Sequence, residues 1–171
     1  NVREKNRVKI EEAIRELHFE INETARGLKT NTTRTIGVVI PELNSVFFAT
    51  VIGRIEDTLR KHGYALMICD CRTDKVRERE AVEFLMRKRV DGLINMPVDG
   101  KGRHLEKFRR TGKPVVLIDR EINGLGCDSV CADNREAMKE AVKLLVENGH
   151  RGIGMVAGTQ DVLTAQERLM G

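Results

Sequence analysis

The segment Asn22–Lys29 combines one large apolar side chain with basic neighbours. Leu28 lies between Arg26 and Lys29 in a short run that is compatible with a helix. Proteins that enter the minor groove of DNA commonly insert an apolar wedge between base steps while cations neutralise the flanking phosphates. The segment therefore fits a minor-groove contact. The alternative interpretation is a linker helix with a buried leucine and solvated cations.

A second group of residues could bind a small polar ligand. Phe47 and Phe48 follow one apolar run, and Asp119 and Arg120 follow another. An aromatic ring offers a flat face on which a sugar or nucleobase can stack, and charged groups can bind hydroxyls in pairs. The alternative is that one phenylalanine belongs to the core and that Asp119 and Arg120 form an ordinary surface pair.

The sequence offers no comparable case for catalysis, a metal or a cofactor. The four cysteines have spacings unlike those of a zinc ribbon, and no paired histidines accompany them. Neither Gly124-Leu125-Gly126 nor Gly152-Ile153-Gly154 has the third glycine or the strand-to-helix context of a phosphate-binding loop. We interpret the first as a turn and the second as the start of a buried strand, and we expect a protein that is not an enzyme.

The elements that would position these residues begin with one amphipathic helix over residues 2–18. Ile10, Ala13, Ile14 and Leu17 repeat at helical spacing, and Asn1 can cap the helix with Glu4 three residues further on. Such a narrow apolar stripe cannot stabilise an isolated helix in water, so this helix must pack on another element.

Beyond Thr35, short apolar runs alternate with amphipathic segments. Runs that are apolar throughout predict strands covered on both faces, hence a parallel sheet with helices above and below. The predicted strands are Ile36–Ile40, Tyr64–Cys69, Val90–Met96, Val115–Ile118, Asp128–Ala132 and Ile153–Ala157.

Helix boundaries have their own signals. Gly63 and Gly149 are placed to end helices in the left-handed conformation, and Asp74 and Asn134 are placed to cap helix starts.

Taken in order, these features resemble the LacI/GalR family of bacterial transcription regulators. The resemblance covers the full length and rests on many short motifs at family spacing. They are the first helix, Ala25-Arg26-Gly27-Leu28-Lys29, Thr35–Pro41, Phe47-Phe48, Lys88–Gly92, Pro114–Arg120, Asp133-Asn134, Gly149-His150-Arg151 and Arg168-Leu169.

The resemblance implies a domain organisation with a periplasmic-binding-protein-like α/β fold. Residues 1–21 would form the last helix of a helix-turn-helix domain, whose base-reading helix has no counterpart here. Residues 22–34 would form a hinge, residues 35–132 the first effector-binding subdomain and residues 133–171 the start of the second. On this interpretation the chain is a fragment, and the apolar faces of its last part lack the sheet they require.

The resemblance also assigns residues to sites. Effector contacts would come from Phe47, Phe48, Asp119 and Arg120, and from Thr164 and Arg168 on a later helix. DNA contacts of the hinge would come from Asn22, Ala25, Arg26, Leu28 and Lys29.

The hinge departs from the family pattern at two positions. Ile21 and Gly27 stand where the family usually has proline and serine. A glycine inside a helix costs roughly 0.5–1 kcal/mol relative to alanine, so we expect the hinge helix to fold only on DNA.

The implied function is an effector-responsive DNA-binding regulator, with repression as the expected mode. It would work as a cytoplasmic homodimer, would need no cofactor and would sense a small sugar-like or nucleobase-like ligand. The dimer face would include the helix of residues 46–61 or that of residues 75–89. The net charge of +4 adds little to the case for DNA. A sugar-binding receptor of the periplasmic kind, without DNA binding, is the alternative, and a flavodoxin-like enzyme comes third.

Overall fold

The computed structural model describes residues 3–16, 32–160 and 162–171, without the side chains of residues 5 and 11. The chain divides into two compact units, Asn1–Thr33 and Arg34–Gly171. In the first unit, helix α1 spans Glu4–Glu16, in agreement with the predicted amphipathic helix. The predicted cap at Asn1 and the predicted DNA contacts of the hinge lie outside the described residues.

The second unit is built on a five-stranded parallel sheet. Its order is β2-β1-β3-β4-β5, and every neighbouring pair is parallel, as the apolar runs predicted. The strands are β1 Thr35–Ile40, β2 Ala65–Asp70, β3 Gly92–Asn95, β4 Val115–Ile118 and β5 Asp128–Val130.

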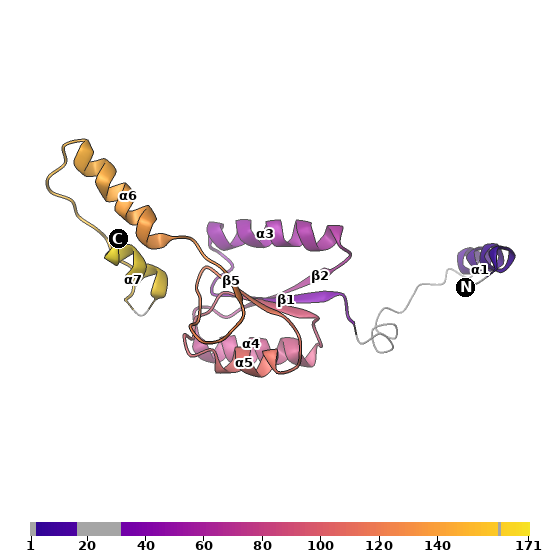
Figure 1. Ribbon diagram of the computed structural model, residues 1–171. Coiled ribbons are helices and arrows are strands. Elements are labelled where there is room, and N and C mark those ends of the chain that lie inside the picture. The colour runs from indigo at the N-terminus through magenta and orange to yellow at the C-terminus, as the bar shows by residue number, and fades with distance from the viewer. Residues whose placement is uncertain (1–2, 17–31, 161) are drawn as a thin grey trace. The chain divides into compact units, whose positions relative to one another are not determined.

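Helices cover both faces of the sheet (Figure 1). Helix α3 (Val46–Lys61) lies on one face, and helices α4 (Lys75–Arg87) and α5 (Arg103–Arg109) lie on the other. Helices α6 (Asn134–Glu147) and α7 (Leu163–Met170) follow and contact each other. None of the described helices is both long and apolar enough to cross a membrane.

The sheet separates two apolar clusters. Successive residues of a strand point to opposite faces. Val38 and Ile40 accordingly join Ile52 of α3 in one cluster, and Val39 joins Leu85 of α4 in the other. Burial on both faces explains why β1 reads as a continuous apolar run.

The predicted helix ends are confirmed with one correction. Gly63 and Gly149 have φ of 73° and 85°, and the Asp74 carboxylate accepts hydrogen bonds from the amides of Val76 and Arg77. The cap of α6, however, is Asp133 and not Asn134. The Asp133 carboxylate accepts the amide of Glu136, while the Asn134 side chain is engaged by α7.

The predicted strand Ile153–Ala157 is wrong, and with it the interpretation of Gly152–Gly154 as the start of a buried strand. Residues 151–159 form no strand in the described structure, and Ile153, Met155 and Val156 are exposed. A strand needs a neighbour to pair its amides and carbonyls. The sheet ends at β5 and supplies no neighbour for this segment.

Candidate functional site

The carboxyl ends of β1, β3 and β4 meet at one edge of the sheet. Open α/β sheets bind ligands outside this edge, where the chain leaves adjacent strands. The segments leaving it here are Pro41–Phe48 after β1, Met96–Asp99 after β3, and Asp119 and Arg120 after β4. Four of the six predicted effector-binding residues therefore lie at this one edge.

Phe47 and Phe48 differ in their surroundings. Both lie in the first turn of α3, with ring centroids 5.2 Å apart and an interplanar angle of 64°. Phe48 packs against the cluster that contains Val38 and Met96, whereas the Phe47 side chain is 53% exposed. Phe47 is thus the ring that remains available for stacking, and Phe48 supports it from the core.

Asp119 and Arg120 are held more tightly than an ordinary surface pair. The Asp119 carboxylate lies 3.3 Å from Nε of Arg120, and both side chains are only 16% exposed. Asp119 has φ of 70°, which is uncommon for a residue with a side chain, and its amide donates to the carbonyl of Val130. Nη1 of Arg120 donates to the carbonyl of Pro97 at 3.0 Å. The pair is therefore part of the framework between β4, β5 and the loop after β3.

A buried carboxylate, which the sequence analysis did not single out, organises that loop. Glu78 of α4 is fully buried and accepts hydrogen bonds from Nδ2 of Asn95 at 2.8 Å and from the amide of Asp99 at 2.7 Å. The amide of Val98 donates to the same carboxylate at 3.2 Å. A sequence signal existed, because Glu78 precedes Val82 and Leu85 by four and seven residues and so shares their buried face.

This environment keeps Glu78 ionised. Burial raises the pKa of Glu78, but the nearby imidazole of His104 and hydrogen bonds from Asn95 and the Asp99 amide outweigh it and leave the pKa below its ordinary value. Nε2 of His104 lies 3.4 Å from the carboxylate, a long contact. The neighbouring Cys71 responds in the opposite sense, since burial and then the charge of Glu78 raise its pKa to about 11. Cys71 is therefore a protonated core thiol.

The hydrogen bonds of Glu78 also influence the position of Arg120. The loop whose amides bind Glu78 also carries Pro97, whose carbonyl receives Arg120. A charged anchor beneath the loop thus fixes the acceptor that orients the guanidinium above it.

The two predicted residues of α7 are placed differently. Thr164 is 6% exposed, and Arg168 donates from Nε to Oδ1 of Asn134 at 2.8 Å. A cavity of about 250 Å³ does join this part of the chain to the sheet edge, with Arg120 in its wall together with Val162 and Leu163. Thr164 and Arg168 are not among its lining residues, so the structure does not bring all six predicted residues to one cavity.

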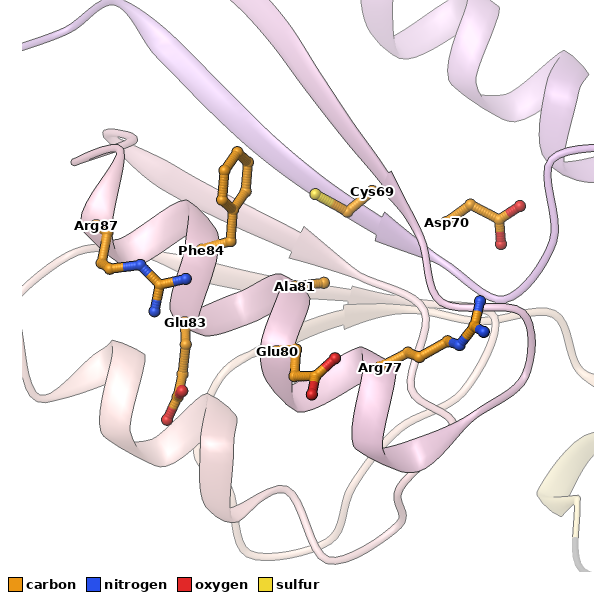
Figure 2. A pocket seen from close by; sticks show the side chains of 8 residues that line it. All are labelled: Cys69, Asp70, Arg77, Glu80, Ala81, Glu83, Phe84 and Arg87. Carbon is orange, nitrogen blue, oxygen red and sulfur yellow. The ribbon is translucent and has the colours of Figure 1, made fainter.

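A separate shallow hollow lies beside the open edge of the sheet (Figure 2). It is formed by the edge strand β2 and by α4, and the side chains of Cys69 and Phe84 extend into the space between them. Its rim is charged. The lining residues are Cys69, Asp70, Arg77, Glu80, Ala81, Glu83, Phe84 and Arg87.

The four cysteines are free thiols. Within residues 3–16, 32–160 and 162–171, no group of three or more His, Cys, Asp or Glu side chains is arranged to hold a metal ion. The carboxyl edge carries aromatic, charged and backbone polar groups.

Comparison with known sequences points to one family. Residues 33–171 match the family described as periplasmic binding proteins and sugar binding domain of the LacI family. The chain is 33% identical to the probable HTH-type transcriptional regulator EndR of Paenibacillus polymyxa, over 98% of the chain and 50% of that protein. It is 34% identical to the HTH-type transcriptional repressor PurR of Aliivibrio salmonicida, over 99% of the chain and 51% of that protein. The chain thus spans about half the length of the curated relatives it matches.

Solved structures agree. A putative ribose operon repressor from Burkholderia thailandensis aligns with 80% of the chain and 52% of its own, at a TM-score of 0.75 and 34% identity. The lac repressor dimer bound to operator and the anti-inducer ONPF aligns with 99% of the chain and 52% of its own, at a TM-score of 0.85 and 25% identity. The match over most of the chain shows that this protein belongs to the LacI family, with the fold of its sugar-binding, periplasmic-binding-protein-like domain.

Proposed function

We propose that this chain is part of an effector-responsive, DNA-binding transcription regulator that acts as a repressor in the cytoplasm. A small sugar-like or nucleobase-like ligand binds at the carboxyl edge of β1, β3 and β4. Its binding changes how two first subdomains pair, and so alters whether two hinge segments can bind DNA together. Such coupling requires two distinct sites, one for the effector and one for DNA. It also requires two conformational states of the protein, whose populations each ligand shifts.

The observation that carries the proposal is the Asp119–Arg120 pair, held beside the loop that Glu78 anchors. Arg120 presents a planar guanidinium whose position is fixed by Asp119 and by the Pro97 carbonyl. A pre-positioned guanidinium binds vicinal hydroxyls or a phosphate with less loss of side-chain entropy than a mobile one. The exposed ring of Phe47 lies at the same edge and adds a stacking face.

Relatives support this class of ligand. The Cra regulator of Pseudomonas putida was solved with fructose 1-phosphate, and a LacI-type protein from Alkaliphilus metalliredigens with D-xylulofuranose. Thr164 and Arg168 join the proposed site if the subdomain that contains α7 closes over the ligand. In that event Arg168 must exchange its hydrogen bond with Asn134 for one with the ligand.

The proposed DNA contacts are Asn22, Ala25, Arg26, Leu28 and Lys29, and the proposed dimer face includes α3 or α4. The hollow between β2 and α4 adds support for α4, because it adjoins the outer edge of β2, where no described strand pairs, and because Phe84 is exposed there. The lac repressor structure, solved as a dimer on its operator, is similar over nearly the whole chain.

Two measurements on the purified chain test the proposal. Thermal unfolding would be followed with D-ribose, fructose 1-phosphate or adenine, and DNA binding would be followed by gel shift at low and moderate salt. We expect one ligand class to raise the melting temperature, and DNA binding to weaken steeply with salt.

The variant Arg120→Gln should lose the ligand-induced shift, whereas Arg103→Gln, an exposed arginine near the same edge, should keep it. Ligand binding without any DNA binding would favour the alternative, a sugar-binding receptor. A chain that responds to none of the three ligands refutes the assigned effector site.

A further inference from the structure

Cations gather at the amino ends of the strands, the edge opposite the proposed effector site. In a parallel α/β sheet each helix runs antiparallel to the strands, so the helix carboxyl ends and their connectors meet at this edge. Seven basic residues lie there, and we call them the basic edge: Arg34, Lys61, Arg87, Lys88, Arg89, Arg110 and Lys113. They come from four separate connections, so the cluster exists only in the folded chain.

The basic edge is tied to the sheet framework. Nζ of Lys113 donates to the carbonyls of Arg89 at 2.8 Å and Val90 at 2.5 Å, which joins two neighbouring connectors. The amide of Arg34 donates to the Asp91 carboxylate, and a Cβ on Gly63 would lie 3.1 Å from Nη1 of Arg34. These hydrogen bonds join the connections that lead into β1, β3 and β4.

Helix dipoles explain part of this charge but not all of it. A cation near a helix carboxyl end is favourable, because that end carries about −0.5 of a unit charge. Three helices would thus account for about 1.5 of the seven positive charges. Among the described residues at this edge, Asp91 and Asp128 add two carboxylates, and Glu106 of α5 pairs with Arg110 across 3.4 Å. A clear positive excess remains.

The opposite edge shows no such excess. The segments that leave the carboxyl ends of the first four strands mix both signs. The carboxylates there are Glu42, Asp70, Asp74, Asp99, Asp119 and Glu121, and the cations are Arg72, Lys75, Lys101, Arg103 and Arg120. The charge of this unit is therefore distributed along the strand direction, positive at one edge and balanced at the other.

The basic edge lacks the apolar anchor of a typical protein interface. None of the exposed large apolar side chains in the described structure lies in its connectors. Specific protein–protein interfaces are centred on buried aromatic or apolar groups. Sequence-independent binding to duplex DNA needs only regularly placed cations that neutralise phosphates.

We propose that the basic edge binds the phosphate backbone of duplex DNA without reading its sequence. This inference rests on the proposed DNA-binding function and adds a second contact surface to the hinge. Thr35, the first residue of β1, lies at this edge, and residues 1–33 precede it in the chain.

The test compares two triple variants of the whole chain with equal change of charge. The first, Lys61→Gln with Lys88→Gln and Arg110→Gln, removes exposed cations of the basic edge. The matched control, Lys75→Gln with Lys101→Gln and Arg103→Gln, removes exposed cations at the carboxyl edge. Binding to a fluorescent duplex of arbitrary sequence is measured by anisotropy across a series of KCl concentrations, after circular dichroism confirms that both variants fold.

We expect the basic-edge variant to lower the slope of log affinity against log salt by roughly 2 to 3, since each neutralised phosphate contributes about 0.9. The control should keep the slope of the unmodified chain. If the basic-edge variant and the control give the same slope of log affinity against log salt, the inference is wrong. An acidic protein would then be the better candidate partner for the basic edge.

A hinge variant separates this inference from the proposed function. If Arg26→Gln with Lys29→Gln lowers the slope and the basic-edge variant does not, the hinge assignment stands and the inference fails. If only the basic-edge variant lowers it, the inference stands and the hinge assignment fails. No salt-dependent binding by the unmodified chain refutes both.

Discussion

The side-chain amide of Asn95 donates a hydrogen bond to Glu78 across 2.8 Å, and both side chains are fully buried between β3 and α4. This contact links the end of the central strand to the helix beneath it. With the amides of Val98 and Asp99 on the same carboxylate, it fixes the loop that orients Arg120. A buried charge is tolerated here because hydrogen bonds replace its lost water.

Replacing Glu78 by Gln should destabilise the fold at neutral pH. A glutamine amide turns a donor toward backbone amides that need an acceptor, so we expect a loss of about 1–3 kcal/mol in the free energy of unfolding. Urea denaturation measures it. Glu80→Gln, on the exposed side of the same helix, is the control and should change stability little.

The stability difference between the parent chain and Glu78→Gln should depend on pH. The folded pKa of Glu78 is below its ordinary value of 4.5, so folding favours the ionised form. Its contribution is complete above the ordinary value and is lost as pH falls through the lowered folded pKa. Denaturation curves between pH 7 and pH 3 should therefore converge for the two proteins. A gap that stays constant to the lowest pH would argue against an ionised Glu78.

Gly37→Ala should destabilise the core through a steric clash. A Cβ at this position would lie 2.8 Å from Cδ1 and 3.0 Å from Cδ2 of Leu85, whose side chain is fully buried. Overpacking of this kind costs about 1–3 kcal/mol. Gly53→Ala is the matched control, because nothing lies within 4 Å of its Cβ and α3 should gain about 0.5–1 kcal/mol. Thermal melts should move in opposite directions, and equal shifts would contradict this account.

Asp119→Asn should separate ligand binding from stability. Asparagine tolerates the positive φ of 70° at this position, so the backbone conformation should be kept, although the partly buried ion pair with Arg120 is lost. The charge that faces Arg120 is lost, and with it the ligand-induced rise in melting temperature should fall or disappear. Isothermal calorimetry with the ligand identified by the thermal screen measures this. Undiminished binding would remove Asp119 from the site.

Amides in Ile153–Ala157 should exchange rapidly with solvent. This segment forms no strand, and Ile153, Met155 and Val156 are exposed. Hydrogen exchange should show little protection there compared with Val38–Ile40 in the inner strand β1. Strong protection in a monomer would contradict the described structure, whereas protection that appears only in a dimer would indicate pairing with a second copy.

The parallel sheet could be predicted from the sequence because its cause is local. Continuous apolar runs such as Val38–Ile40 require cover on both faces, and a parallel sheet with helices on each side provides it. The helix ends at Gly63 and Asp74 could be predicted for the same reason. Glycine adopts the positive φ that ends a helix, and an aspartate carboxylate accepts the amides at a helix start.

Only the tertiary structure decided which of several equivalent residues takes a role. Asp133 caps α6, because contacts with α7 engage the neighbouring Asn134. Ile153–Ala157 has the composition of a strand but no partner to pair with. Glutamate is usually a surface residue, yet Glu78 is buried. Its carboxylate accepts the amides of a loop that lies about twenty residues further along the chain. Composition and spacing determine which elements form, whereas pairing, capping and burial depend on neighbours that are distant in sequence.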